Sequence, residues 1–142
     1  MIYCDISLLV SALSNEARSE QVRAWLETVA AGDLCVSDWT VTEFSSAIAA
    51  KVRFGSLPAE RKPAIMTQWH TMLAHELTRE AVSRDAFDLA ARFCDMSGSG
   101  LRAGDALHLA VASLGGHALA TLDERMRDAA GAVGVKVISI GD

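Results

Sequence analysis

The stretch LRAGDALHLAVA, residues 101–112, decides the fold, because it places a carboxylate at the start of an otherwise apolar helix. The residues that follow Asp105 are apolar around the whole helical circumference up to Leu114, apart from His108 and Ser113. A helix that is apolar on all sides is buried. We therefore expect a buried helix from Asp105 to Leu114, with Asp105 at an interior edge. A helix N-terminus there stabilises an anion without neutralising it.

Outward from this helix, the hydrophobic pattern predicts alternating strands and helices. Short apolar runs bounded by polar residues or glycine predict strands at 1–4, 33–37, 117–122 and 135–140. Apolar positions at helical spacing predict helices at 7–13, 17–31, 39–54, 62–76, 83–96 and 124–134. Strands that alternate with helices favour a parallel sheet with right-handed crossovers. The expected fold is α/β, a three-layer α/β/α arrangement around a central parallel sheet of four to five strands.

Length and composition bound the class of protein. A chain of 142 residues with 51% apolar and 22% charged residues has the size and composition of one globular domain, spanning residues 1–142. The net charge of −5 argues against a broad basic surface for nucleic acid, although an acidic site that recruits cations remains compatible with a nuclease. Three cysteines without CxxC spacing favour free thiols over disulfides or a thiolate zinc site. No signal segment or membrane-spanning run is evident, so we expect a cytoplasmic protein.

Two aspartates follow predicted strands directly. Asp5 comes after the strand at 1–4, and Asp123 comes after the strand that begins at His117. In open α/β sheets the working crevice lies beyond the carboxyl ends of the strands, so these two acids are expected to share it. Asp105 begins a helix that follows another helix, which makes its position less certain.

Glu43 is the unusual acid of the helix at 39–54. It lies almost opposite the large apolar stripe, on a side that also holds Trp39 and Ala47. It is the only charged residue between Asp38 and Lys51 and has no ionic partner one turn away. We interpret this face as covered, and a covered carboxylate needs a cation nearby.

If these four acids converge, their mutual repulsion raises pKa values or requires cations. Carboxylate oxygens and water are the ligands that Mg²⁺ prefers, with Mn²⁺ as a substitute. A site of this kind activates water for in-line attack on a phosphodiester. The sequence therefore predicts a metal and catalytic site made of Asp5, Glu43, Asp105 and Asp123.

Each of these residues also has a structural explanation. The three aspartates precede helices and could be N-caps, and Glu43 alone could be a surface residue. For His108 we favour a packed, hydrogen-bonded histidine over a metal ligand. Ser7 and Thr121, each two residues from an acid, are interpreted as hydrogen-bond donors that hold the carboxylates and not as nucleophiles.

Three arginines lie near the predicted acidic edge. Arg102 and Arg125 are candidate contacts for RNA phosphates, and Arg127 is a weaker candidate, since it and Arg125 could equally solvate a helix face. The tryptophans fall on predicted helices and are assigned to cores or interfaces.

With these residues assembled, the chain resembles PIN domains, and more narrowly the VapC toxins of toxin-antitoxin pairs. The matching pieces are MIYCDISLLV, SDWTVTEFSSAI, LRAGDALHLAVA and LATLDERMRDAAGAVGVKVI, with GDALHLA and TLDERM the most specific. The resemblance implies a Mg²⁺- or Mn²⁺-dependent ribonuclease that cleaves selected cellular RNAs. It implies that Asp5 and Asp105 hold the metal, that Asp123 is a further ligand or orients water, and that Glu43 is the acid of the second motif.

The resemblance also implies partners: a cognate antitoxin whose tail fills the active-site groove, and a homodimer that can join a larger toxin-antitoxin complex. One departure is Ile6, where relatives often carry a small hydroxyl residue, although Ser7 follows it. Two alternatives stay open. The chain could be a receiver-like phosphoacceptor domain, although no paired acids end the first strand. It could also be an inactive PIN-like binding module, although all four acids are present.

Overall fold

The computed structural model describes residues 1–96, 98 and 100–141. Its strands are β1 (Ile2–Cys4), β2 (Leu34–Ser37), β3 (Thr78–Glu80), β4 (Ala118–Ala120) and β5 (Val137–Ile138). Its helices are α1 (Ile6–Leu13), α2 (Ser19–Thr28), α3 (Asp38–Arg53), α4 (Lys62–His75), α5 (Arg84–Asp95), α6 (Ala103–Leu114) and α7 (Glu124–Ala132), with a 3₁₀ turn, η1 (Ala59–Arg61). The elements alternate as the hydrophobic pattern predicts, with bounds that differ by a few residues.

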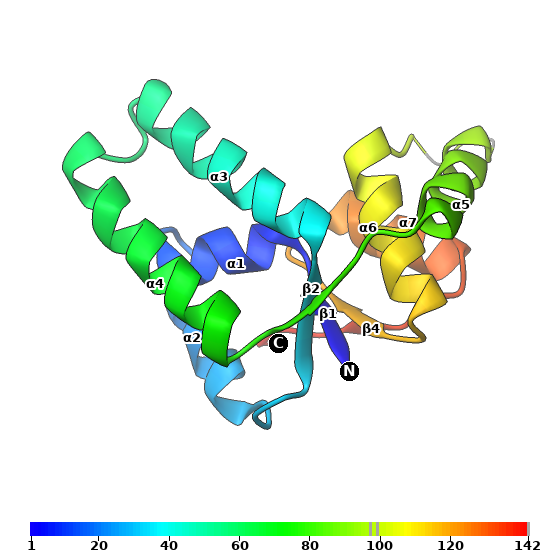
Figure 1. Cartoon of the computed structure of the whole chain (residues 1–142), viewed down its shortest axis with the longest axis horizontal. Helices are drawn as coiled ribbons and strands as arrows, with labels where there is room; N and C mark the ends of the chain where they lie inside the picture. Colours follow the sequence, from blue (N-terminus) through cyan, green and yellow to red (C-terminus); the bar gives the residue numbers. More distant parts are fainter. Residues whose placement is uncertain (97, 99, 142) are drawn as a thin grey trace.

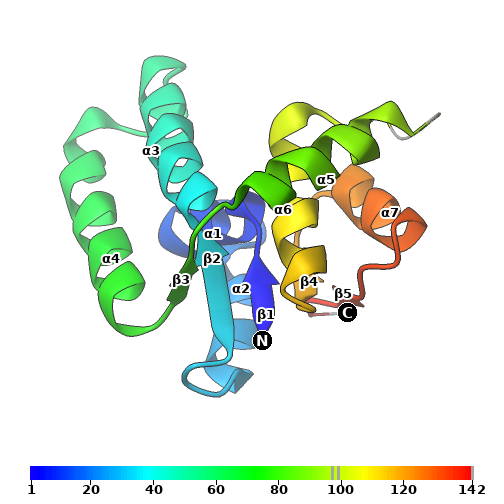
Figure 2. The ribbon, with the colours of Figure 1, turned by 45° about the vertical axis from the view of Figure 1, so that its right-hand side comes forward.

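The described strands form one parallel sheet in the order β3-β2-β1-β4-β5, of which Figure 1 labels the three central strands and Figure 2 labels all five. β1 pairs with β2 through Tyr3 and Cys35, and with β4 through Cys4 and Ala120. The edge strand β3 was not among the predicted strands, because its sequence Thr-Arg-Glu is polar and largely exposed. It joins the sheet through backbone pairing with β2, which leaves no hydrophobic signal.

Helices cover both faces of the sheet, which confirms the predicted three-layer α/β fold (Figure 2). One core lies against α5, α6 and α7 and contains Tyr3, Cys35 and Leu119 from the sheet. The other lies against α1, α2, α3 and α4 and contains Cys4 and Val36. Neighbouring strand residues therefore point into opposite cores, as the two-residue period of a strand requires. The prediction of a buried helix holds for residues 106–112 of α6, which are buried, but not for Leu114 at its end, which is 53% exposed.

The strand order places a switch point between β1 and β4. From β1 the chain adds β2 and β3 on one side, and then adds β4 and β5 on the other. Ligands bind at such switch points, beyond the carboxyl ends of the strands. Asp5 follows β1 there, and its backbone N–H donates to the carbonyl of Ala120 at the end of β4 (3.0 Å). The order also differs from 2-1-3-4-5, the order of flavodoxin-like receiver domains, which argues against the receiver-like alternative.

Among the described residues, no helix is both long and apolar enough to span a bilayer.

Candidate active site

A polar cavity of about 340 Å³ opens between α3, α6 and the start of α7. It is called the acidic cavity here and is lined by Trp39, Glu43, Gly100, Leu101, Arg102, Gly104, Asp105, Asp123 and Arg125. Three of the four predicted acids and both predicted RNA-contacting arginines thus lie around one space. The fourth acid, Asp5, is buried with 3% exposure and acts electrostatically on Asp105 together with Asp123 and Glu43.

Asp5 is held by hydroxyl groups from two segments. Its Oδ2 accepts hydrogen bonds from Ser7 Oγ (2.7 Å) and Thr121 Oγ1 (2.8 Å), and caps α1 through the backbone N–H of Ser7. Its other oxygen, Oδ1, is buried without a hydrogen-bond partner. An unsatisfied buried carboxylate oxygen is costly, and a bound cation relieves that cost. N-capping and metal binding are therefore compatible here, because each uses a different oxygen.

Asp123 is the N-cap of α7. Its Oδ1 accepts from the backbone N–H groups of Arg125 (2.9 Å) and Met126 (3.2 Å), while its own N–H donates to Thr121 Oγ1 (3.1 Å). The structural interpretation of this aspartate as a cap is correct, and the same residue also lines the acidic cavity. Capping engages one carboxylate oxygen, which sets the direction in which the carboxylate faces the cavity.

Asp105 does not cap its helix. α6 begins at Ala103, two residues earlier than predicted, and Arg102 is the N-cap position without a side-chain cap bond. Burial raises the pKa of the Asp105 carboxyl, and the charges of Asp5, Asp123 and Glu43 raise it further, against a smaller lowering by His108. A carboxyl with this perturbation in a cavity marks a candidate functional site. The physical causes of the raised pKa are therefore burial first and the neighbouring negative charges second.

The hydrogen-bond partner of Glu43 lies on another helix, α6. Its Oε2 contacts Nε2 of His108, and Nδ1 of the same ring bonds the hydroxyl of Tyr3 (2.7 Å). His108 is fully buried, and its Nε2 also lies 3.9 Å from Asp5 Oδ1. The histidine is therefore packed and hydrogen bonded, and it links α6 to two of the acids. The predicted face of α3 is only partly covered, since Glu43 is 23% exposed and Ser46 is exposed.

The series of hydrogen bonds from Glu43 through His108 to Tyr3 continues to residues of β2 and α3. The Tyr3 hydroxyl also bonds Ser37 Oγ (2.8 Å) and Thr40 Oγ1 (3.3 Å), which form the capping box of α3. The sequence shows Tyr3 only as one apolar residue of a buried strand. Its role depends on partners 34 or more positions away, for which the sequence carries no local signal.

Gly104 is a second residue that sequence reasoning missed. A Cβ at this position would lie 2.9 Å from Oε1 of Glu43 and 3.3 Å from the ring of Trp39. The absence of a side chain lets α6 approach α3 closely enough to bring Asp105 and Glu43 to the same cavity. Trp39 is partly buried against the core below α5 and α6, and its indole Nε1 is buried without a hydrogen-bond partner.

The three candidate arginines differ in position. Arg102 and Arg125 are exposed and line the acidic cavity, so both can reach a phosphate that enters it. Arg127 is not among the residues that line the cavity, and its Nε is buried without a hydrogen-bond partner. Arg102 and Arg125 therefore lie at the acidic cavity, whereas Arg127 does not line it.

The donor set of the acidic cavity suits a hard divalent cation. Carboxylate oxygens are its ligands, and Asp5, which acts electrostatically on Asp105, has one carboxylate oxygen without a hydrogen-bond partner. Among the described residues, the one group of three His, Cys, Asp or Glu ligands within 4.8 Å of one another lies elsewhere, at Cys35, Glu80 and His117. The carboxylate oxygens of the acids are thus farther apart than the ligand atoms of a metal site made entirely of protein groups. Mg²⁺ needs only one or two carboxylates and keeps several waters, so this spacing fits it.

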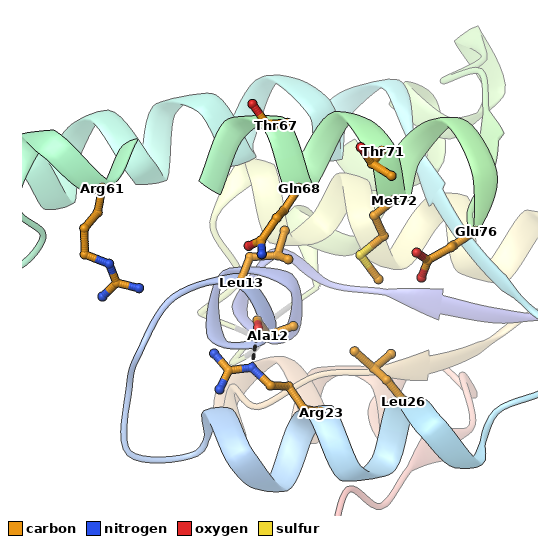
Figure 3. Close-up of a pocket in the computed structure, with 10 residues that line it drawn as sticks. All are labelled: Ala12, Leu13, Arg23, Leu26, Arg61, Thr67, Gln68, Thr71, Met72 and Glu76. Atoms are coloured by element: carbon orange, nitrogen blue, oxygen red, sulfur yellow. Dashed lines mark hydrogen bonds between the residues drawn. The ribbon is translucent and has the colours of Figure 1, made fainter. Parts of the chain in front are cut away.

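A larger groove of about 570 Å³ lies on the other helical layer, between α1, α2 and α4 (Figure 3). Arg23 lies along it and donates to the carbonyl of Ala12 (2.9 Å), and the groove also holds Arg61 and Glu76. None of the predicted acids lines it. Size alone therefore does not locate the chemistry of this molecule.

A protein-family model described as PIN domain matches residues 2–132. The chain belongs to the PIN domain family. The match covers all four acids and both flanking layers of helices, which confirms the family suggested by the sequence motifs. PIN domains are typically nucleases. No curated protein sequence matches the chain significantly.

Solved structures of toxin-antitoxin proteins share the fold of this PIN domain. FitAcB from Neisseria gonorrhoeae matches with a TM-score of 0.75 and 21% identity, over 98% of this chain and 97% of that one. VapC20 from Mycobacterium tuberculosis, a toxin that cleaves the sarcin-ricin loop, matches with a TM-score of 0.74 and 16% identity, over 97% and 98%. A toxin-antitoxin complex from Klebsiella pneumoniae matches with a TM-score of 0.68 and 19% identity, over 95% of each chain.

Proposed function

We propose that this chain, as one nuclease domain over residues 1–142, is a Mg²⁺-dependent endoribonuclease and the toxin of a type II toxin-antitoxin pair. The observation that carries the proposal is that Glu43, Asp105 and Asp123 line one cavity at the switch point of the sheet, while the buried Asp5 acts electrostatically on Asp105. Family membership supports a nuclease, and the likeness to toxin structures favours the toxin class.

The carboxylates of Asp5, Asp105 and Asp123, with Glu43 in support, would hold one or two Mg²⁺ ions. When bound, the metal would lower the pKa of a water for in-line attack on a phosphodiester and would offset the charge on the phosphate and on the leaving oxygen. Mn²⁺ would substitute, because it accepts the same oxygen ligands.

The protein's own residues then orient the reactants. Ser7 and Thr121 fix one oxygen of Asp5 and leave the other, Oδ1, free of hydrogen bonds for a cation. His108 holds the carboxylate of Glu43 against α6. Arg102 and Arg125, at the exposed rim of the cavity, bind the phosphates that flank the cleaved bond. These two arginines would supply local positive charge for RNA on a chain whose net charge is −5.

The proposed partners follow from the same class. The relatives include FitAB bound to an IR36 DNA fragment and VapBC2 from Rickettsia felis bound to a fragment of its promoter DNA. By analogy we propose a cognate antitoxin that neutralises this chain, a toxin homodimer inside a larger complex, and action on RNA in the cytoplasm. An antitoxin segment that enters the acidic cavity would need a basic group to meet the carboxylates.

The test is RNA cleavage by the purified chain under control of metal. Cleavage should require Mg²⁺, stop with excess EDTA, and return when Mg²⁺ is restored. Asp105→Asn should abolish cleavage, whereas Asp88→Asn, an exposed acid on α5, should not. Cleavage that persists in excess EDTA would refute metal dependence. A folded chain that cuts no RNA with Mg²⁺ or Mn²⁺ would instead favour the inactive binding module.

A further inference from the structure

A second cluster of metal-binding side chains lies apart from the acidic cavity. Cys35 on β2, Glu80 at the end of β3 and His117 just before β4 each offer one ligand atom, and the three atoms lie within 4.8 Å of one another. None of these residues lines the acidic cavity. The three residues lie far apart in the sequence and match no metal-binding motif. The sequence therefore predicted a free thiol at Cys35 and gave no sign of this cluster.

The cluster is buried and already arranged. Cys35 is fully buried, His117 is 9% exposed, and the Glu80 side chain is 26% exposed, so the cluster opens to solvent on the glutamate side. Nε2 of His117 lies 2.7 Å from Oε1 of Glu80. The Cys35 sulfur has only a weak interaction with the carbonyl of Ile2, at 3.5 Å. A small outward movement of the partly exposed Glu80 carboxylate from the ring would admit an ion between the three ligands.

The packing of Gly115 against the His117 ring is independent evidence that the position of this ring is fixed. A Cβ on Gly115 would lie 2.3 Å from His117 Nε2 and 2.5 Å from Cδ2. The backbone of Gly115 is right-handed, with φ −77°, so its conformation does not require glycine. Glycine is required here because the His117 ring occupies the space that a Cβ would need. The C-terminal end of α6 therefore holds the ring with Nε2 toward Glu80 and Cys35.

We propose that Cys35, Glu80 and His117 form a Zn²⁺ site, with water as the fourth ligand. Thiolate sulfur, imidazole nitrogen and carboxylate oxygen are the three ligand types of protein zinc sites. This set is softer than the all-oxygen acidic cavity, so the two sites select different ions. The ion would tie β2 and β3 to the segment before β4 across the sheet face below α5 and α6.

Proton release follows from this assignment. Burial raises the pKa of the Cys35 thiol to about 12, with a further rise from the Glu80 charge and a lowering by the N-terminal amino group. A coordinating thiol is deprotonated, so binding displaces its proton to solvent and strengthens as pH rises. The same burial keeps the metal-free thiol protonated and unreactive.

Cobalt substitution in the full-length chain tests the site. The protein is stripped with a chelator and titrated with Co²⁺, and the thiolate-to-cobalt charge-transfer band is followed. One equivalent should produce the band, Zn²⁺ should remove it, and excess Mg²⁺ should not. Cys35→Ser should abolish the band, whereas Cys4→Ser, a buried thiol on the opposite face of the sheet, should retain it. Absence of the band in the parent, or its survival in Cys35→Ser, would overturn the proposal.

Two milder variants keep the test sharp if the serine variant unfolds. Glu80→Gln changes a partly exposed side chain, and it should lower Zn²⁺ affinity by more than about 100-fold, beyond the usual effect of residues that only support ligands. Gly115→Ala removes no ligand but displaces the ring, and should lower affinity by about 10- to 100-fold. Unchanged Zn²⁺ affinity in both variants would reject the site. Mg²⁺-dependent RNA cleavage is measured separately in each, so failure of the proposed ribonuclease leaves this result interpretable.

Discussion

Replacing Asp5 by Asn should separate catalysis from stability. The carboxylate has 3% exposure, and its Oδ2 accepts hydroxyl hydrogen bonds from Ser7 and Thr121 that an asparagine oxygen can also accept. Exchanging a charged acceptor for a neutral one costs roughly 1 kcal/mol for each of these two bonds. Removing the Asp5 charge also relieves its repulsion of Asp105, and at an effective dielectric constant of about 20 this returns free energy of the same order.

These two effects nearly cancel in the metal-free protein. We expect the free energy of unfolding to change by less than about 1 kcal/mol, or less than about 4 °C in melting temperature. Cleavage should fall by about 1000-fold or more, since loss of metal assistance of about 4 kcal/mol corresponds to three powers of ten.

Thermal unfolding with and without Mg²⁺ gives the second measurement. At an ion concentration 100 times its dissociation constant, the parent should gain about 2.7 kcal/mol, a rise of roughly 5 to 10 °C. Asp5→Asn should gain little, while Asp88→Asn should behave like the parent. The reasoning is refuted if the asparagine variant keeps both cleavage and the Mg²⁺-dependent rise, or if it is strongly destabilised without metal.

Three further outcomes follow from the same cavity. Gly104→Ala introduces a Cβ that would lie 2.9 Å from Glu43 Oε1, so cleavage should fall by about 10- to 100-fold while circular dichroism stays unchanged; unchanged kinetics would show that the close approach is unimportant. The folded-state pKa of Asp105 is raised, so the neutral acid favours the fold below the unfolded-state pKa, and this contribution disappears as pH rises through the folded-state value. The free energy of unfolding of the metal-free protein should therefore fall as pH rises over that range, and urea titrations of Asp105→Asn should show a flatter dependence. Replacing Arg102 or Arg125 by Gln should raise KM for RNA with little change in kcat. It should also reduce the slope of log affinity against log salt by about 0.7 for each phosphate that the variant no longer neutralises. An unaltered salt slope would show that this arginine does not contact RNA.

The acids were identifiable before the tertiary structure because their signals are local. Asp5 and Asp123 each follow an apolar run, and the carboxyl ends of parallel strands share one edge. Asp105 lies in the first turn of a helix whose following residues, 106–112, are nearly all apolar and are buried. These patterns reflect which side of an element faces the core, and that property is encoded within a few neighbouring residues.

The pairings across the cavity had no such signal. Glu43 and His108 are 65 positions apart, and Tyr3 and His108 are 105 apart, so their contacts depend on how α3, α6 and β1 pack. The single-helix argument for Glu43 found no ionic partner, and its partner comes from another helix. In the same way, the close approach at Gly104 is invisible until two helices meet.

The amino-acid sequence by itself determined the layered α/β fold, the buried central helix and the acids at the strand ends, because periodicity and strand termini are short-range properties. Only the tertiary structure decided that a polar triplet forms the edge strand, that a histidine joins two acids, and that Cys35, Glu80 and His117 meet. These features arise from backbone pairing and from side chains brought together by packing, and neither is recorded in any local pattern of residues.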